Sequence, residues 1–219
     1  MRNVIEGSFE YKLEEWEYLD GSHVSETFHS VAVEPGEQTL QLADDTSFRV
    51  KTGTVDVNTS FSSVSLGNFF GAETPIVLAQ AQTFNGADPI VTRLRNISNS
   101  SFDVRLQEEE ANGGHTTETV GYVALQPATG VLYGRPFEVQ QTGTTVDENW
   151  TQLTFDQQYD QPQFIAAMQT FNGSDTATLR YRNLSGTGVE VKVEEEQSAD
   201  TETAHVNERV GYLVIEGST

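Results

Sequence analysis

Carboxylates and histidines recur together at matching places along this chain, and they are the residues best suited to chemistry. Acidic clusters occupy residues 14–17, 108–110 and 194–196. A histidine and a glutamate follow each cluster, as His23 and Glu26, His115 and Glu118, and His205 and Glu208. Carboxylates beside an imidazole can hold a divalent cation, and oxygen-rich sets of this kind suit calcium.

The clusters have three interpretations, which the residues alone leave open. One is a metal site, and a second is a sugar site in which carboxylates accept hydrogen bonds from hydroxyl groups. The third is a charged outer strand whose carboxylates pair with arginines at 93, 95, 180 and 182 on the neighbouring strand, each pair contributing about 0.2 to 1 kcal/mol. The candidate ligand-binding residues here are Trp16, Glu109, Glu110, His115, Glu118, Glu196, His205 and Glu208.

One glutamate in each cluster has the wrong parity for an outer face. Strand side chains alternate between faces, and Glu108 falls on the same side as Phe102, while Glu195 falls on the same side as Val189. Glu15 occupies the matching place in the first cluster. These carboxylates should therefore lean towards the core and need a partner there, unless a bulge or strand end releases them. A trimer axis, where the glutamates would meet arginines of other subunits, is a further alternative.

A second polar motif is the string QTFNG, at residues 82–86 and again at 169–173. An aspartate follows each copy, so Asn85, Asp88, Asn172 and Asp175 are candidate ligand-binding residues. Loops at the ends of sandwiches are common recognition sites. The alternative is a plain turn, in which Asn-Gly supplies positive φ and Phe84 plugs the edge of the core.

Composition narrows the class of function. The net charge of −21, from 33 acidic and 12 basic residues, opposes binding to nucleic acid or anionic lipid and suits a salty or calcium-rich medium. Cysteine is absent, and no apolar run is long enough to span a membrane. No nucleophile elbow, zinc-protease motif or phosphate-binding loop occurs. We therefore expect a non-enzymatic protein without membrane insertion, with calcium as the single cofactor worth considering.

The chain contains an internal repeat. Besides QTFNG, the string RLRN at 93–96 returns as RYRN at 180–183, and VGY at 120–122 returns at 210–212. These matches predict two complete units, unit 1 at 46–127 and unit 2 at 136–217. Residues 1–36 reproduce the second half of a unit and lack its first half; we call this segment the half repeat.

Each unit predicts short strands separated by turn residues, with alternation of apolar and polar side chains. In unit 1 the expected strands are 48–55, 64–69, 75–79, 91–96, 102–106 and 120–125. The fold class is therefore all-β, with tandem six-stranded antiparallel β-sandwiches plus the N-terminal half repeat. Residues 36–46 and 128–135 are expected to be linkers.

The order of these short motifs resembles the H-type lectin domain, over both units and part of the half repeat. The resemblance implies a non-catalytic sugar binder that commonly forms trimers and recognises N-acetylgalactosamine-type ligands. In the family the sugar site consists of an aspartate loop, an arginine and a Trp-His pair. By position the loop corresponds to residues 58–60 here, the arginine to positions near Pro89 and Thr176, and the Trp-His pair to 109–110 and 196–197. Only the half repeat keeps an aromatic at the last position, Trp16.

These observations predict a module for adhesion or self-assembly, extracellular or at the cell surface. A half sandwich leaves strand edges and an apolar face uncovered, which invites completion by another chain. The expected partners are copies of the chain, as a trimer or head-to-tail polymer, with glycans as an alternative. The competing prediction is a carbohydrate-binding lectin with a rebuilt, calcium-assisted site.

Overall fold

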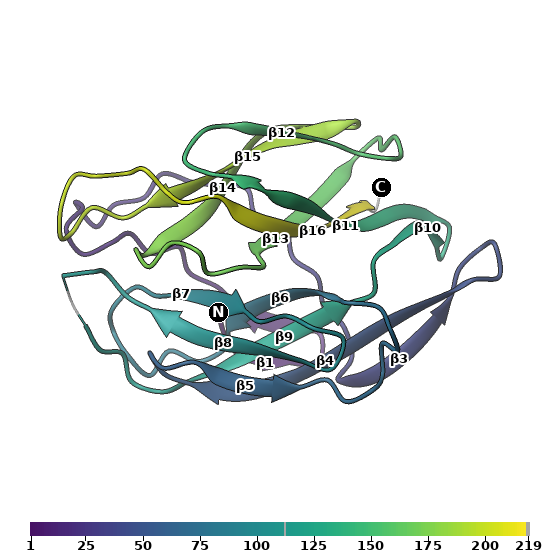
Figure 1. Ribbon diagram of the computed structural model, residues 1–219, viewed down its shortest axis with the longest axis horizontal. Coiled ribbons are helices and arrows are strands. Elements are labelled where there is room, and N and C mark those ends of the chain that lie inside the picture. The colour runs from purple at the N-terminus through teal and green to yellow at the C-terminus, as the bar shows by residue number, and fades with distance from the viewer. Residues whose placement is uncertain (112, 218–219) are drawn as a thin grey trace.

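The computed structural model describes residues 1–111 and 113–217, and every regular element in these ranges is a β-strand. The sixteen strands form antiparallel sheets that belong to two sandwiches and one small hairpin (Figure 1). The all-β class and the tandem sandwiches are as predicted. Among the described residues there is no helix of the length and apolarity that a membrane crossing requires.

Unit 1 is a sandwich of a four-stranded and a three-stranded sheet. The first sheet has the order β3-β4-β9-β6, and the second has the order β5-β8-β7. The strands are β3 (Gly36–Gln41), β4 (Ser47–Val57), β5 (Ser62–Ser65), β6 (Ile76–Ala81), β7 (Val91–Arg95), β8 (Ser101–Gln107) and β9 (Glu118–Leu125).

Unit 2 repeats this topology, with the sheets β10-β11-β16-β13 and β12-β15-β14. Its strands are β10 (Ala128–Leu132), β11 (Arg135–Val146), β12 (Thr151–Thr154), β13 (Pro162–Met168), β14 (Ala177–Ser185), β15 (Gly188–Glu195) and β16 (Glu208–Glu216). The two units therefore have equivalent strands at equivalent sequence positions.

The count of six strands per sandwich was wrong, because each unit has seven. The extra strand is β3 or β10, and both lie in segments expected to be linkers. Residues 36–41 pair with residues 47–52 of β4, and residues 128–132 pair with residues 135–139 of β11. Gly36 (φ 110) and Pro127 suggested chain breaks, yet each of them only precedes or opens an edge strand.

Three apolar clusters hold the molecule together. One fills each sandwich, with Phe102 and Val120 at the centre of unit 1 and Val191 and Val214 in unit 2. The third lies between the units, where the outer faces of the two four-stranded sheets meet. It includes Phe48 and Phe137, whose ring centroids are 4.9 Å apart. The four-stranded sheets are consequently buried on both faces, and the units stack as one body (Figure 1).

The half repeat forms the hairpin that its sequence equivalents form in the complete units. Strands β1 (Arg2–Ile5) and β2 (Ser8–Glu10) pair with Arg2 opposite Glu10. An asparagine follows the arginine in all three copies, and all three asparagines have positive φ: Asn3 at 51°, Asn96 at 52° and Asn183 at 52°. Beyond β2 the described backbone is irregular up to β3, and most of its side chains are exposed.

Candidate functional site

A buried network of two glutamates and one histidine lies at one end of unit 1. His115 Nδ1 is 2.5 Å from Glu108 Oε1, and its Nε2 is 3.1 Å from Glu118 Oε1. All three residues are less than a tenth exposed. The inward orientation predicted for Glu108 is confirmed, and its partner is the histidine that follows the acidic cluster.

Unit 2 contains the same network. His205 Nδ1 is 2.5 Å from Glu195 Oε1, and His205 Nε2 is 3.3 Å from Glu208 Oε1. These side chains are also buried. Because both histidines use both ring nitrogens on carboxylates, the networks bind the loop and strand ends to one another and offer no free imidazole nitrogen for a ligand.

The QTFNG loop wraps around the last glutamate of each network. In unit 1 the backbone N–H groups of Asn85 and Gly86 donate to Glu118 Oε1 at 2.6 and 2.8 Å, and the Thr83 hydroxyl donates to Glu118 Oε2. In unit 2 the N–H groups of Asn172 and Gly173 and the Thr170 hydroxyl donate to Glu208 in the same way.

The turn interpretation of this loop was wrong in two respects. Neither Asn85 nor Gly86 has positive φ. Glycine is required instead because a Cβ at Gly86 would collide with the His115 ring. Phe84 is 45% exposed and so does not plug the core edge of its own unit.

The networks set the charge states of their members. Burial alone would raise the pKa of Glu118, but donors from Thr83, Gly86, His115 and Asn85 outweigh it and hold that pKa below its usual value. The pKa of Glu208 is lowered in the same manner. Burial would lower the pKa of His205, yet the two carboxylates raise it overall, whereas burial raises the pKa of Glu195.

Arg93 extends from unit 1 into the unit 2 network. Its side chain is only 1% exposed, and burial lowers its pKa to about 10. The guanidinium donates to Glu208 Oε1 at 3.2 Å and to the carbonyl of Asp175 at 3.0 Å. It also lies 4.7 Å from the ring centroid of Phe171. The equivalent Arg180 of unit 2 is half exposed and pairs with Glu194, as the outer-strand interpretation expected for both arginines.

Side chains from neighbouring repeats cap the edges of the four-stranded sheets. The Gln169 side chain accepts from the backbone N–H of Val77 and donates to its carbonyl, both at 2.9 Å. Val77 lies on β6, the edge strand of unit 1. At the equivalent Phe164 of unit 2, His29 Nδ1 of the half repeat lies 3.1 Å from the backbone nitrogen and 3.2 Å from the carbonyl oxygen.

Equivalent contacts join the three repeats in a constant order. Lys12 of the half repeat lies over the ring of Phe84 in unit 1, at 5.1 Å from the centroid. Arg105, the counterpart of Lys12, lies 5.8 Å from the centroid of Phe171 in unit 2. Unit 2 returns to the half repeat through His29 and through the Gln197 N–H, which donates to the Tyr18 hydroxyl at 3.1 Å. The repeats thus form a closed ring of three.

The remaining predicted site residues are divided between the junction of units 1 and 2 and a cavity that Trp16, Asp88, His115 and Glu118 border. Glu196 accepts from the N–H of Glu110 at 2.6 Å, and Glu110 accepts from the N–H of Thr176 at 3.0 Å. Glu109 is buried beside them. Asp88 comes within 4.8 Å of the ligand atoms of Glu108 and His115, and Asp175 comes within that distance of Glu195 and Glu202. A structural role is the better explanation, because His115 already contacts two carboxylates in unit 1 and Glu195 already contacts His205 in unit 2.

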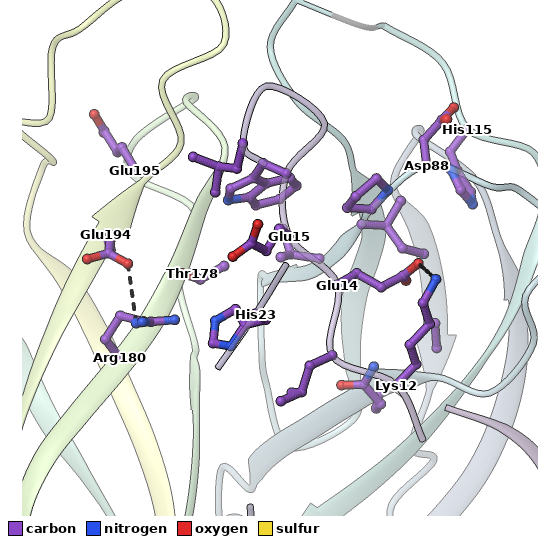
Figure 2. Close-up of a pocket in the computed structure, with 18 of the residues that line it drawn as sticks. Lys12, Glu14, Glu15, His23, Asp88, His115, Thr178, Arg180, Glu194 and Glu195 are labelled. Atoms are coloured by element: carbon purple, nitrogen blue, oxygen red, sulfur yellow. Dashed lines mark hydrogen bonds and ion pairs between the residues drawn. The ribbon is translucent and has the colours of Figure 1, made fainter. Parts of the chain in front are cut away.

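The half repeat lacks the network. Glu15 Oε2 accepts from the N–H of Ser22 at 3.1 Å, and His23 Nδ1 contacts the carbonyl of Val24 at 2.8 Å. Both side chains instead border a cavity of about 550 Å³ among the three repeats, together with Trp16 and Arg180. Figure 2 shows Glu15 and His23 facing Thr178 and Arg180 across this space.

Sequence reasoning missed several residues that matter in the structure. Glu108 and Glu195 carried a signal, their inward parity, but were not placed among the candidate site residues. The repeated strings contained Arg93 and Gln169 but gave no sign of their partners, which belong to a different repeat, and His29 carried no signal. Only the arrangement of the repeats could identify them.

The comparisons with known proteins give one informative match. A stretch of halomucin from Haloquadratum walsbyi is 34% identical to this chain over 224 residues. The alignment covers 100% of the chain and 2% of that relative, so the chain spans about one fiftieth of the relative's length. No family model matches the chain, and no solved structure matches it. The chain is thus similar throughout to a small part of a much longer protein.

Proposed function

We propose that the chain is a non-enzymatic repeat module of an extracellular or cell-surface protein, and that it serves adhesion or assembly. The main supporting observation is that the buried polar groups of the chain stabilise the structure, some within one unit and some between units. Glu108, His115 and Glu118 bond to one another and to their own loop, and Arg93 bonds to the next unit. Because these side chains are bonded to one another, they fix the positions of loops and units and are not available as catalytic groups.

The surface chemistry supports the same proposal. A net charge of −21 keeps the chain soluble where salt screens self-repulsion. The similarity to halomucin supports a setting within a long chain, and the relative's name identifies it as a mucin. A compact repeat with capped sheet edges suits such a setting, because capped edges resist unwanted pairing with other strands.

The half repeat supplies the means of assembly. Its exposed apolar side chains include Ile5 at 69%, Tyr11 at 58% and Val24 at 74%. The strands that would cover such side chains in a complete unit have no counterpart in residues 1–36. We therefore propose that first-half strands from a neighbouring repeat complete the half repeat, within a longer chain or between chains.

The test is the assembly state of the purified chain in high and low salt, followed by light scattering and electron microscopy. Concentration-dependent association that is lost in a chain truncated to begin at Glu34 would support the proposal. A strictly monomeric particle at every concentration, with no adhesion to a surface coated with the same protein, would contradict it.

A second candidate function is carbohydrate binding in the cavity between the repeats. Trp16 and Phe84 border this space beside Glu14 and Asp88, and aromatic faces with carboxylates can bind a pyranose ring and its hydroxyls. A glycan array read in calcium and in chelator tests it. Signal that disappears in Trp16→Ala would favour this function, and silence in both media would remove it.

A further inference from the structure

One side of the cavity between the repeats resembles the surface with which unit 1 contacts unit 2. In the contact between units 1 and 2, Phe171 packs on Phe61 with ring centroids 5.3 Å apart and an interplanar angle of 80°. Two cations flank Phe61: Arg95 at 3.7 Å and Arg105 at 5.4 Å from its centroid. An aromatic ring between two cations therefore receives the phenylalanine of the next QTFNG loop.

Unit 2 has an equivalent aromatic ring between two cations. Trp150 is the counterpart of Phe61, with Arg182 at 4.1 Å and Lys192 at 5.3 Å from its ring centroid. No aromatic ring among the described residues packs on Trp150. Arg180, the counterpart of buried Arg93, is half exposed and borders the cavity together with Lys192. Figure 2 shows Arg180 pairing with Glu194 on this side of the cavity.

The half repeat presents the complementary side. Glu15, His23 and Glu26 are the counterparts of Glu108, His115 and Glu118, yet they do not form the network. In both complete units the last glutamate receives its donors from the QTFNG loop. The segment that would hold such a loop for the half repeat belongs to its first half. Glu26 nevertheless lies close enough for its charge to act on Tyr181, which follows Arg180.

We propose that this space is a docking seat for the QTFNG-type loop of a first-half repeat, the partner that completes the half repeat. The proposal rests on the proposed function, whose assembly step it makes specific. The phenylalanine of the loop packs on Trp150, and its threonine hydroxyl and two N–H groups bond to Glu26. Arg180 then turns from Glu194 to Glu26, as Arg93 bonds to Glu208.

His29 restricts which partner fits. Its counterparts in the complete units are Gly121 and Gly211. A Cβ at Gly121 would collide with the Gln82 side chain, and a Cβ at Gly211 would lie 2.8 Å from the Cδ of Gln169. His29 already occupies that space and caps Phe164 as Gln169 caps Val77. The natural partner therefore carries a small residue in place of the glutamine.

An extended chain tests the seat. A copy of residues 37–94 is placed directly before Arg2, so that the added first half joins the half repeat as Leu94 joins Arg95 in unit 1. One version keeps His29 and the other carries His29→Gly, because the added copy brings a glutamine. The control replaces the phenylalanine of the added QTFNG loop by alanine. The chain has two tryptophans: Trp16 borders the cavity, and Trp150 lies against Lys192, which also borders it, so tryptophan emission reports on this region.

We expect hydrogen exchange of backbone amides 26–33 to slow on the order of 100-fold in the extended His29→Gly chain, with a shift of tryptophan emission to shorter wavelength. In the unextended chain the same substitution should speed exchange, since the bonds to Phe164 are lost. The alanine control should lose most of the emission shift.

A separate polypeptide of residues 37–94, titrated onto the unextended His29→Gly chain, repeats the test should the extended chain fail to fold. Unchanged exchange and unchanged emission in both formats would overturn the seat. That result is distinct from failure of the proposed function, which is read from the assembly and adhesion of the unextended chain.

Discussion

Arg93 gives the sharpest test of how the repeats are held together. The substitution Arg93→Met keeps an unbranched apolar stem and removes the guanidinium with its charge. It leaves Glu208 buried without the guanidinium, and it frees the carbonyls of Gly173 and Asp175. The matched control is Arg180→Met, because Arg180 holds the equivalent position on β14 and pairs with Glu194 in solvent.

The expected magnitude follows from the contacts. Removing one partner of a buried ion pair costs about 3–5 kcal/mol where nothing else compensates the remaining charge. Glu208 keeps donors from Thr170, Asn172, Gly173 and His205. We therefore expect a loss of about 2–3 kcal/mol for Arg93→Met. The exposed control pair is worth about 0–1 kcal/mol.

Urea unfolding at low and high salt measures the difference. With a slope of about 2–3 kcal/mol per molar, the midpoint of Arg93→Met should fall by about 1 M, with the slope unchanged. The loss should be nearly independent of salt, because buried pairs are screened weakly. Equal losses for the two variants, or a loss below about 0.5 kcal/mol for Arg93→Met, would refute the argument that this arginine joins the units.

Three further predictions concern the networks and the sheet edges. Gly173→Ala places a Cβ 2.5 Å from the His205 ring and should lower stability by about 1–3 kcal/mol, whereas Gly143→Ala, with its nearest atom at 3.5 Å, should change the melting temperature little. Gln169→Leu uncaps β6 and should cost about 1–3 kcal/mol, with faster amide exchange along that strand; unchanged exchange would contradict the capping role. The lowered pKa of Glu208 stabilises the fold above its unfolded value of 4.5, and this stability is lost as the pH falls through the folded pKa. The raised pKa of His205 contributes stability that is fully present below pH 6.5 and is lost as the pH rises through the folded pKa. In a plot of melting temperature against pH, His205→Gln should therefore remove the decline on the alkaline side of this range and keep the decline at acid pH.

The sequence predicted the fold class because strand alternation and turn residues are local signals. It failed on the first strand of each unit. β3 carries Gln38, Thr39 and Leu40 on a half-exposed edge, where apolar alternation is weak. The strand expected at 75–79 is confirmed as β6, and the structure explains its run of consecutive apolar residues: one face meets the core of unit 1 and the other meets unit 2.

The site was predictable only where its groups lie within one repeat. The recurrence of Glu118 and Glu208 after a histidine identified members of both networks. The role of the QTFNG loop depended on backbone N–H groups, which every residue carries and no sequence pattern distinguishes. Contacts between repeats, such as that of His29 with Phe164, depend on the packing of whole sandwiches.

The order of contacts around the three repeats limits how such modules can grow. A head-to-tail contact that returns to its starting member after three steps is saturated, so a fourth repeat finds no vacant position in the same circle. Longer arrays would then consist of successive groups of three repeats, and such groups would be joined by completion of the half repeat or by the connecting segments.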